Sequence, residues 1–254
     1  MKISITRNNW ISIASVVIFL VLWKLLSLHF HSEFIVPSPE KTFKALCHLF
    51  VEKGFLSVVG TTVLRGVIGF AVAAIFGIAA GIIAGLYSGF NAYITPILVT
   101  IRSIPVIAIT LLALIWFNPY SVPVFIGILT MFPMVCTNVI SGMNSVDKSL
   151  VQMAEFYKVG KKRIIKELYI PAIAPFIFSG ISNAFGIGWR AIIVGEVLGQ
   201  PKYGIGTNMQ TAQIFLNVDV LIAWTCIAVL LSYFFEILIK NIERHALKWT
   251  RVRS

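Results

Sequence analysis

Six apolar runs, each about as long as a lipid bilayer is thick, constrain this sequence more than any other feature. They cover approximately residues 9–28, 62–87, 93–117, 121–141, 170–196 and 218–241. A helix needs about 20 mostly apolar residues to cross the hydrocarbon core. The composition agrees, because 58% of the residues are hydrophobic and 12% are charged, whereas soluble domains are about 45–50% apolar. We therefore predict an all-α integral membrane protein with about six transmembrane helices.

The first apolar run follows Lys2 and Arg7, which is also how a signal peptide begins. The apolar stretch from Trp10 to Leu28 is longer than the core of a signal peptide, and no small-x-small cleavage site follows it. We predict an uncleaved first helix.

Proline residues mark the third run as irregular. It contains Pro96 and Pro105, and a proline inside a helix removes a hydrogen bond and bends the axis. We expect a kink in this span, or a span that begins late.

The distribution of Lys and Arg sets the orientation. With six spans, thirteen of these residues fall in segments on the same side as the two termini, and four fall in segments on the other side. Cytoplasmic loops carry the excess of basic residues. Both termini are therefore predicted to lie in the cytoplasm, and the net charge of +11 is explained without nucleic acid.

The apolar runs and the segments between them divide the chain into three parts. Residues 1–60 hold the first span and an outer segment, in which Ser38 begins a predicted amphipathic helix from Glu40 to Lys53. Residues 61–242 form the membrane core, and residues 243–254 form a basic cytoplasmic tail.

The longest inner segment, residues 142–170, predicts two short helices. The first begins at Ser145 or Asp147 and carries apolar side chains on one face, and the second runs from Lys161 to about Tyr169. Gly160 stands between them as a natural helix stop. A basic helix-turn-helix is a docking surface in shape and charge, and the alternative is an ordinary positive-inside loop.

Three glycines in the second run are spaced four residues apart. Gly77, Gly81 and Gly85 therefore lie on one face of a helix. Small residues at this spacing let a second helix approach closely. We predict a packing interface inside the bundle rather than a pore-lining face.

Polar side chains within the membrane are costly and require a reason. Arg102 stands near the third span, and Asn183, Arg190 and Glu196 lie in the fifth run. Asn183 and Arg190 are seven residues apart and share a helix face. The four residues are candidates for a polar translocation path. Alternatively, Arg190 and Glu196 pair with each other as a buried structural contact, or they lie at the interface with water.

No pattern typical of a metal site or a nucleotide site occurs. The three cysteines and four histidines lack the spacing of ligands or of a disulfide framework. The sequence has no Gly-x-x-x-x-Gly-Lys phosphate loop. We expect no metal and no cofactor on this chain.

The inner segment resembles the Glu-Ala-Ala loop found in the permease subunits of ABC importers. In that pattern a Gly follows the second Ala by four residues and precedes a Pro by thirteen. Counting back from Pro171 places the Gly position at Lys158 and the triplet at Gln152-Met153-Ala154. Ala154 and Pro171 match the pattern, Gln152 and Lys158 replace Glu and Gly, and Gly160 could supply the freedom of the missing glycine. Tyr157 lies in the same loop.

Further short pieces resemble the nitrate/sulfonate/taurine-type branch of this family, in the same order along nearly the whole chain. They are Pro37-Ser38-Pro39, Thr61-Thr62 to Arg65, Gly69-Phe70, Arg102 with Ile104-Pro105, Phe132-Pro133 leading to Asn138 and Gly142, Val146-Asp147, Trp189-Arg190, Glu196 with Leu198-Gly199, and Gly204-Ile205-Gly206.

The resemblance implies a type I ABC importer permease fold and a transport subunit that is not itself an enzyme. It implies two copies of an ATP-binding subunit, with ATP and Mg on that partner, docked on the loop 142–170. It also implies a second permease copy, as a homodimer, and an extracytoplasmic solute-binding protein. The implied substrate is a small anion such as nitrate, a sulfonate or taurine, or alternatively a vitamin precursor such as a thiamine pyrimidine.

Two other classes remain as alternatives. A secondary transporter would often show an internal repeat and broken helices at the midplane, and no convincing repeat is seen. A membrane-embedded enzyme would need a catalytic cluster on neighbouring spans, and none appears in the sequence.

Overall fold

The computed structural model describes residues 4–30, 32 and 34–246. Lys2 and residues 247–254 of the predicted basic tail lie outside this part of the chain. All regular elements within the described residues are helices. They are α1 (Ser4–Phe30), α2 (Pro39–Val51), α3 (Phe55–Leu86), α4 (Ser88–Ser103), α5 (Val106–Trp116), α6 (Val122–Asn144), α7 (Lys148–Phe156), α8 (Lys161–Ile164), the π-helix η1 (Ile165–Tyr169), α9 (Ile170–Gly199), α10 (Ile205–Ile214) and α11 (Val218–Ala246).

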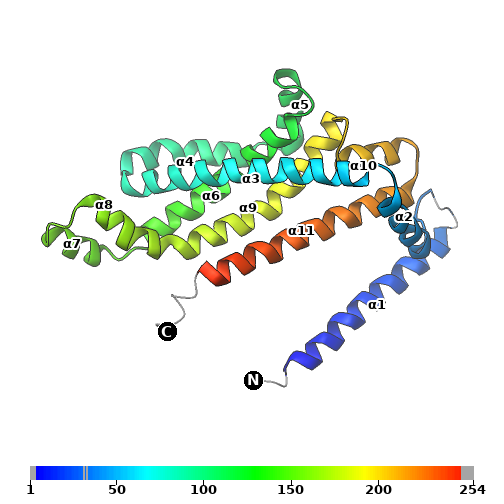
Figure 1. Cartoon of the computed structure of the whole chain (residues 1–254), viewed down its shortest axis with the longest axis horizontal. Coiled ribbons are helices and arrows are strands. Elements are labelled where there is room, and N and C mark those ends of the chain that lie inside the picture. The colour runs from blue at the N-terminus through cyan, green and yellow to red at the C-terminus, as the bar shows by residue number, and fades with distance from the viewer. Residues whose placement is uncertain (1–3, 31, 33, 247–254) are drawn as a thin grey trace.

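The core of the bundle is a layered packing of α3, α6 and α9, with α6 in the middle. α6 makes its most extensive contacts with α9 and α3 (Figure 1). The largest buried cluster contains side chains of all three helices, among them Ala73, Met131, Val135 and Ile192. The apolar periodicity of these runs therefore serves helix–helix contact as well as contact with lipid.

α3 approaches α6 most closely at the glycines of α3 that are spaced four residues apart. A Cβ added to Gly77 would lie 2.8 Å from Cβ of Val135, and one added to Gly81 would lie 2.6 Å from Cβ of Val139. Real Cβ atoms essentially never approach so closely, so only glycine fits at this crossing. The predicted packing interface is confirmed, and its partner is α6.

Among the described residues, four helices are long and apolar enough to cross a membrane. They are Phe55–Leu86, Val122–Asn144, the continuous Lys161–Gly199, and Val218–Ala246. The third predicted span, 93–117, is not one helix, because α4 and α5 meet at a bend of 98° around Ile104 and Pro105. Pro105 cannot continue the hydrogen-bonding pattern of α4. Together the bent pair gives up to five candidate spans, and α1 adds a shorter apolar section, Ala14–Phe30.

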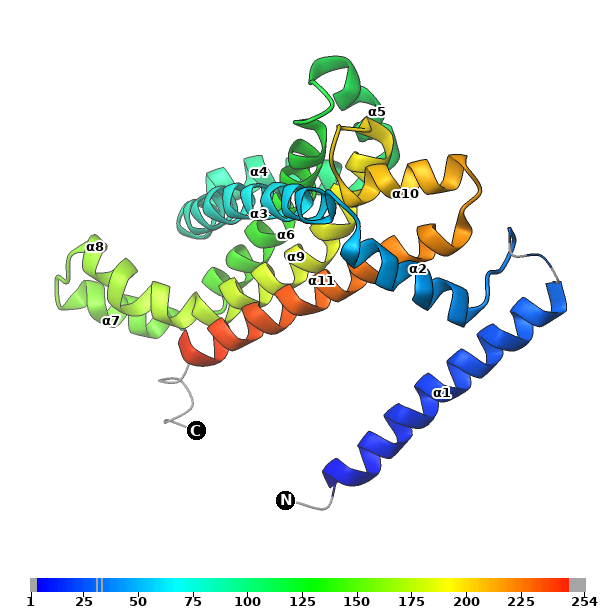
Figure 2. The same ribbon diagram turned by 45° about the vertical axis from the view of Figure 1, so that its right-hand side comes forward.

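α1 stands apart from the bundle and packs mainly against α2 (Figures 1 and 2). α2 is the predicted amphipathic helix. Its N-cap is Ser38, whose side chain accepts a hydrogen bond from the backbone N–H of Lys41 at 3.3 Å. Leu49 of α2 is buried in a cluster with Trp224 of α11. The outer segment is therefore attached to the bundle through α11.

The inner segment ends differently from the prediction. The second short helix does not stop at Tyr169 but runs through η1 directly into α9. The N–H of Ile170 bonds to the carbonyl of Ile165, five residues back. Pro171 has no N–H to bond to Glu167, and a widened turn next to a proline relieves the clash. The loop and the fifth span are consequently one unbroken helix.

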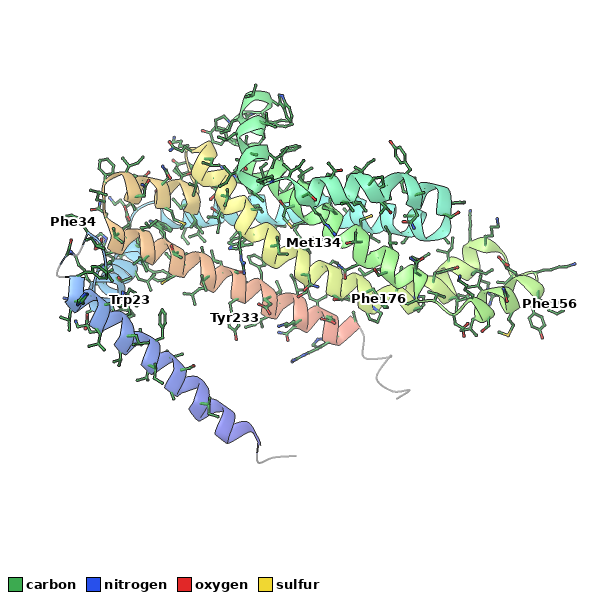
Figure 3. The ribbon with its side chains drawn as sticks, turned by 180° about the vertical axis from the view of Figure 1, so that it is seen from behind. Trp23, Phe34, Met134, Phe156, Phe176 and Tyr233 are labelled. Atoms are coloured by element: carbon green, nitrogen blue, oxygen red, sulfur yellow. The ribbon has the colours of Figure 1, made fainter. Side chains whose placement is uncertain are left out.

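α7 and α8 lie at one end of the molecule, and α2 and α10 lie at the other (Figures 1 and 2). α10 was not among the helices predicted from the sequence. Behind the bundle, α9 and α11 lie side by side along most of their length (Figure 3).

Candidate functional site: an exposed terminal loop and a polar groove

The first short helix of the loop, α7, begins at a residue suited to that position. The carboxylate of Asp147 accepts hydrogen bonds from the backbone N–H and the hydroxyl of Ser149, at 2.8 and 2.7 Å. These bonds stabilise the ionised form, so they lower the pKa of Asp147. Asp147 is the N-cap of α7, one of the two predicted starting points.

The surface of α7 is unusually apolar for an exposed helix. No residue of α7 is buried, and Met153 and Tyr157 are 54% and 72% exposed. Phe156, which the sequence analysis did not single out, is 82% exposed. Gln152 is exposed and Ala154 is partly buried. Contiguous exposed apolar side chains mark interaction surfaces.

The turn after α7 is a Schellman motif with a lysine at the position normally taken by glycine. The N–H of Val159 bonds to the carbonyl of Ala154, and the N–H of Lys158 bonds to that of Glu155. Lys158 has φ of 55°, the left-handed conformation that closes this motif. Counting back from Pro171, which is partly buried in the first turn of α9, therefore located the turn correctly.

The expectation for Gly160 was wrong. Gly160 has φ of −62° and ψ of 139°, an extended conformation open to any residue, and it serves as the N-cap of α8. Gly160 does not end α7, and it does not supply the left-handed residue. Lys158 takes both roles, because its φ lies in the left-handed region despite the side chain.

Two of the polar membrane residues line one groove. Asn183 and Arg190 of α9 both face a groove of about 450 Å³ between α6, α9 and α11. Asn138, Ser182, Ser232 and Glu236 contribute further polar side chains. Asn183 and Arg190 are exposed, so the seven-residue spacing placed them correctly on one face.

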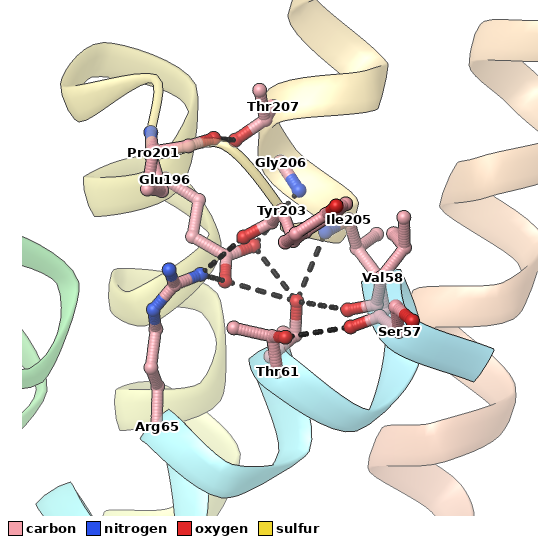
Figure 4. A network of polar contacts seen from close by, with 11 residues as sticks. Ser57, Val58, Thr61, Arg65, Glu196, Pro201, Tyr203, Ile205, Gly206 and Thr207 are labelled. Atoms are coloured by element: carbon pink, nitrogen blue, oxygen red, sulfur yellow. Dashed lines mark hydrogen bonds and ion pairs between the residues drawn. The ribbon is translucent and has the colours of Figure 1, made fainter. Parts of the chain in front are cut away.

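Glu196 lies elsewhere, inside the bundle, and its partner is Arg65 (Figure 4). The carboxylate is 0% exposed and accepts a hydrogen bond from Arg65 at 2.6 Å. It also accepts from the backbone N–H of Gly206 at 3.0 Å, and contacts the hydroxyl of Thr62 at 2.9 Å. The alternative of an Arg190–Glu196 pair is therefore wrong, because Glu196 is already enclosed by α3 and α10.

The same network fixes the connection between α9 and α10. Arg65 also donates to the carbonyl of Tyr203 at 2.7 Å, and the N–H of Ile205 donates to the hydroxyl of Thr62 at 2.9 Å. A Cβ on Gly206 would lie 2.5 Å from the carbonyl oxygen of Ile193. Glycine at 206 therefore allows the first turn of α10 to close over Glu196.

Arg102 is exposed in the last turn of α4, next to the bend before α5. It lies on a different part of the bundle from the groove that contains Asn183 and Arg190. Of the four candidate path residues, Asn183 and Arg190 line one groove. Glu196 is buried inside the bundle, and Arg102 lies apart from the groove.

The sequence of this chain matches a known protein family. The family model described as "Binding-protein-dependent transport system inner membrane component" matches residues 77–248. The chain belongs to this family. The matched part begins within α3 and contains α7, the groove and Glu196, but not α1 or α2.

Three relatives extend the match over most of the chain. The taurine transport system permease protein of Escherichia coli is 23% identical over 96% of this chain and 91% of its own length. The putative aliphatic sulfonates transport permease protein of Bacillus subtilis is 26% identical over 91% and 84%. The bicarbonate transport system permease protein of Synechococcus elongatus is 27% identical over 76% and 73%. These family members are transport permeases.

Several residues of these sites were not predicted as site residues from the sequence. Arg65 and Thr62 appeared only in a stretch that resembles the family, and Glu236 and Ser232 were not predicted at all. An ionisable residue inside an apolar run was the available signal for Arg65 and Glu236. The partner of Arg65, however, comes from another helix, more than a hundred residues away, whereas Glu236 pairs with Lys240 of the same helix.

Proposed function

We propose that this chain is the permease subunit of an ABC importer that moves a small anion across the cell inner membrane. The family match supports a transport subunit, and the functions of the relatives support a small anion such as a sulfonate, taurine or bicarbonate. In this proposal an extracytoplasmic binding protein delivers the solute. ATP and Mg act on two ATP-binding subunits, and two copies of this chain form the path.

The observation that carries the proposal is the surface of α7. A short helix with apolar side chains more than half exposed stands at one end of the bundle, at the position of the family's loop motif. The segment contains no buried residue that would explain those side chains as core. Docking of the ATP-binding subunit would cover them.

The same proposal sets the orientation in the membrane. The α7 end is the basic end, with Lys161, Lys162 and Arg163 in α8, and the end of α11 lies toward it (Figure 1). A cytoplasmic location follows from the positive-inside rule. A six-span bundle then has α1 and the bent α4–α5 pair as its remaining spans.

The groove containing Asn183 and Arg190 is the proposed part of the path. It is open along α9 and α11, and a charged side chain within a membrane faces protein or water rather than lipid. Arg102 and Glu196 are not included, because Glu196 is enclosed and Arg102 lies away from the groove.

Copurification and uptake test this function. The full chain is expressed with its ATP-binding subunit and reconstituted in vesicles together with the solute-binding protein, and ATP-dependent uptake of taurine, ethanesulfonate and bicarbonate is measured. We expect Ala154→Asp, or deletion of 150–158, to abolish uptake while ATP hydrolysis and membrane insertion persist. A charge there would be buried against the partner without compensation.

Ala154→Ser is the matched control, because it adds a small polar group without charge and is expected to retain most of the uptake. Normal uptake by Ala154→Asp would contradict the docking role of α7. Uptake by the lone chain without any ATP-binding subunit would contradict the importer itself.

A further inference from the structure

One face of the helix that leads from the loop into the membrane carries lysines followed by an exposed apolar side chain. Lys162 and Lys166 are exposed, and Ile170, the next residue at four-residue spacing, is 44% exposed. Residues four apart lie on the same face of a helix. This face therefore changes from basic to apolar at the point where α9 begins.

The opposite face of the same helix is occupied by the bundle. Ile164 is 6% exposed, and it lies about 160° from both Lys162 and Lys166 around the helix axis. Leu168, one turn after Ile164, packs against the central core cluster, as does Val151 of α7. The lysine face is therefore directed away from the core cluster that these apolar side chains contact.

The lysines of this face have no ion partner inside the described part of the chain. Arg163 pairs with Glu167 at 2.9 Å, and this pair neutralises the acidic side chain of the same turn. Lys161, Lys162 and Lys166 are exposed, and none of them makes an ion pair within residues 4–30, 32 and 34–246. Three uncompensated ammonium groups thus gather between residues 161 and 166.

The depth of these lysines matches that of phospholipid headgroups. Lys166 and Lys162 precede Ile170 by about 6 and 12 Å along the axis, at 1.5 Å per residue. The headgroup layer extends about 5–8 Å beyond the hydrocarbon core on each side, and a flexible lysine side chain can extend its ammonium group toward that layer. The ammonium groups therefore lie where they meet lipid phosphates.

We propose that Lys162 and Lys166, with Lys161 beside them, bind the headgroup of an anionic phospholipid of the inner leaflet. The acyl chains of this lipid lie along the apolar continuation of the face at Ile170. Basic clusters immediately cytoplasmic to a span attract anionic lipids, by about fivefold for each Lys or Arg. The inference rests on the proposed function for the cytoplasmic orientation of this end of the molecule.

An acidic surface of the ATP-binding subunit is the other partner that a basic face at this end could meet. The position of Ile170 favours lipid. This exposed isoleucine lies one turn closer to the bilayer than Lys166, at a depth that a subunit docked in the cytoplasm does not reach. A basic residue next to an exposed apolar one along a helix is typical of a surface at the lipid interface.

Binding of short-chain lipids to the full-length chain in detergent tests the site. The probes are dioctanoyl phosphatidylglycerol, which is anionic, and dioctanoyl phosphatidylcholine, which has the same acyl chains and no net charge. We expect the wild-type chain to prefer phosphatidylglycerol. Lys162→Gln combined with Lys166→Gln is expected to reduce this preference by about 25-fold, which is about fivefold for each lost charge.

Two matched variants separate this site from the net charge of the chain. Lys44→Gln combined with Lys148→Gln also removes two exposed lysines, one from α2 and one from the first turn of α7, and should leave the preference unchanged. Lys162→Arg combined with Lys166→Arg keeps both charges and should retain the preference. Thermal unfolding of each variant identifies a misfolded chain.

Equal binding of the two lipids by the wild-type chain would overturn the proposal. Full displacement of phosphatidylglycerol by inorganic phosphate at the same concentration would also overturn it, because the acyl chains would then contribute nothing. An unchanged lipid preference in the double Lys→Gln variant, with loss of copurification of the ATP-binding subunit, would assign this face to that subunit instead. Absence of ATP-dependent uptake by the wild-type complex, in contrast, would contradict the proposed function and leave the lipid preference intact.

Discussion

At the residue scale, Lys158 shows how a sequence motif can persist in geometry after its key residue has changed. The family pattern places glycine where the chain turns out of α7. Here a lysine takes the left-handed conformation at φ of 55° and closes the same pair of hydrogen bonds. A side chain makes that conformation unfavourable by about 1–2 kcal/mol per residue. The turn is therefore held by its surroundings rather than by the preference of residue 158.

Replacing this lysine with glycine should stabilise the loop. We expect Lys158→Gly to raise the free energy of unfolding by up to about 1 kcal/mol, because the strain of a positive φ disappears. Thermal unfolding of the purified chain measures the change. Gly160→Ala is the control and is expected to be neutral, since φ there is −62° and no atom lies within 4 Å of the added Cβ. A destabilised Lys158→Gly variant would contradict this explanation.

At the element scale, hydropathy and spacing predicted what depends on one helix alone. The approximate spans, the capped amphipathic α2, the start of α7 at Asp147 and the glycine face of α3 all follow from local patterns. The break at Pro105 was anticipated as a kink, but its angle of 98° was not. The π-helix before Pro171 and the helix α10 depend on contacts with neighbouring elements, so periodicity could not reveal them.

The crossing of α3 and α6 gives a sharp test of this packing. Gly81→Val places two methyl groups against Val139, where a single Cβ would already lie 2.6 Å away. We expect a loss of stability of about 1–3 kcal/mol from overpacking. The measurement is thermal unfolding in detergent, with Gly89→Val as control because nothing lies within 4 Å of a Cβ at residue 89. Similar losses in both variants would argue against a close crossing.

At the scale of the whole molecule, the buried network joins α3 to the end of α9 and the start of α10, which lie 131 to 143 residues further along the chain. Arg65 donates to Glu196 and to the carbonyl of Tyr203, Gly206 N–H donates to Glu196, and Ile205 N–H donates to the hydroxyl of Thr62. The sequence predicted Glu196 to line a translocation path or to pair with Arg190. Its true partner could not be assigned, because 131 residues separate it from Arg65.

Removing one member of this buried ion pair should lower the stability of the protein strongly. Glu196→Ala leaves the guanidinium of Arg65 buried without its carboxylate, and we expect a loss of about 3–5 kcal/mol in stability. The double variant Arg65→Met with Glu196→Leu should lose much less, because no charge remains buried. Glu167→Ala, which removes an exposed pair with Arg163, is expected to cost less than about 1 kcal/mol. Additive losses in the double variant would contradict a coupled pair.

The uninterrupted helix from Lys161 to Gly199 makes the two ends of the molecule mechanically dependent on each other. Its 39 residues extend about 58 Å at 1.5 Å per residue. A rigid rod of that length, tilted by about five degrees at α8, displaces its far end by about 5 Å, roughly the pitch of one helical turn. Arg190 and Glu196 both lie on this helix, beyond the π turn η1. On this geometry, a tilt of about five degrees at α8 would move the opposite end of the helix by about one helical pitch.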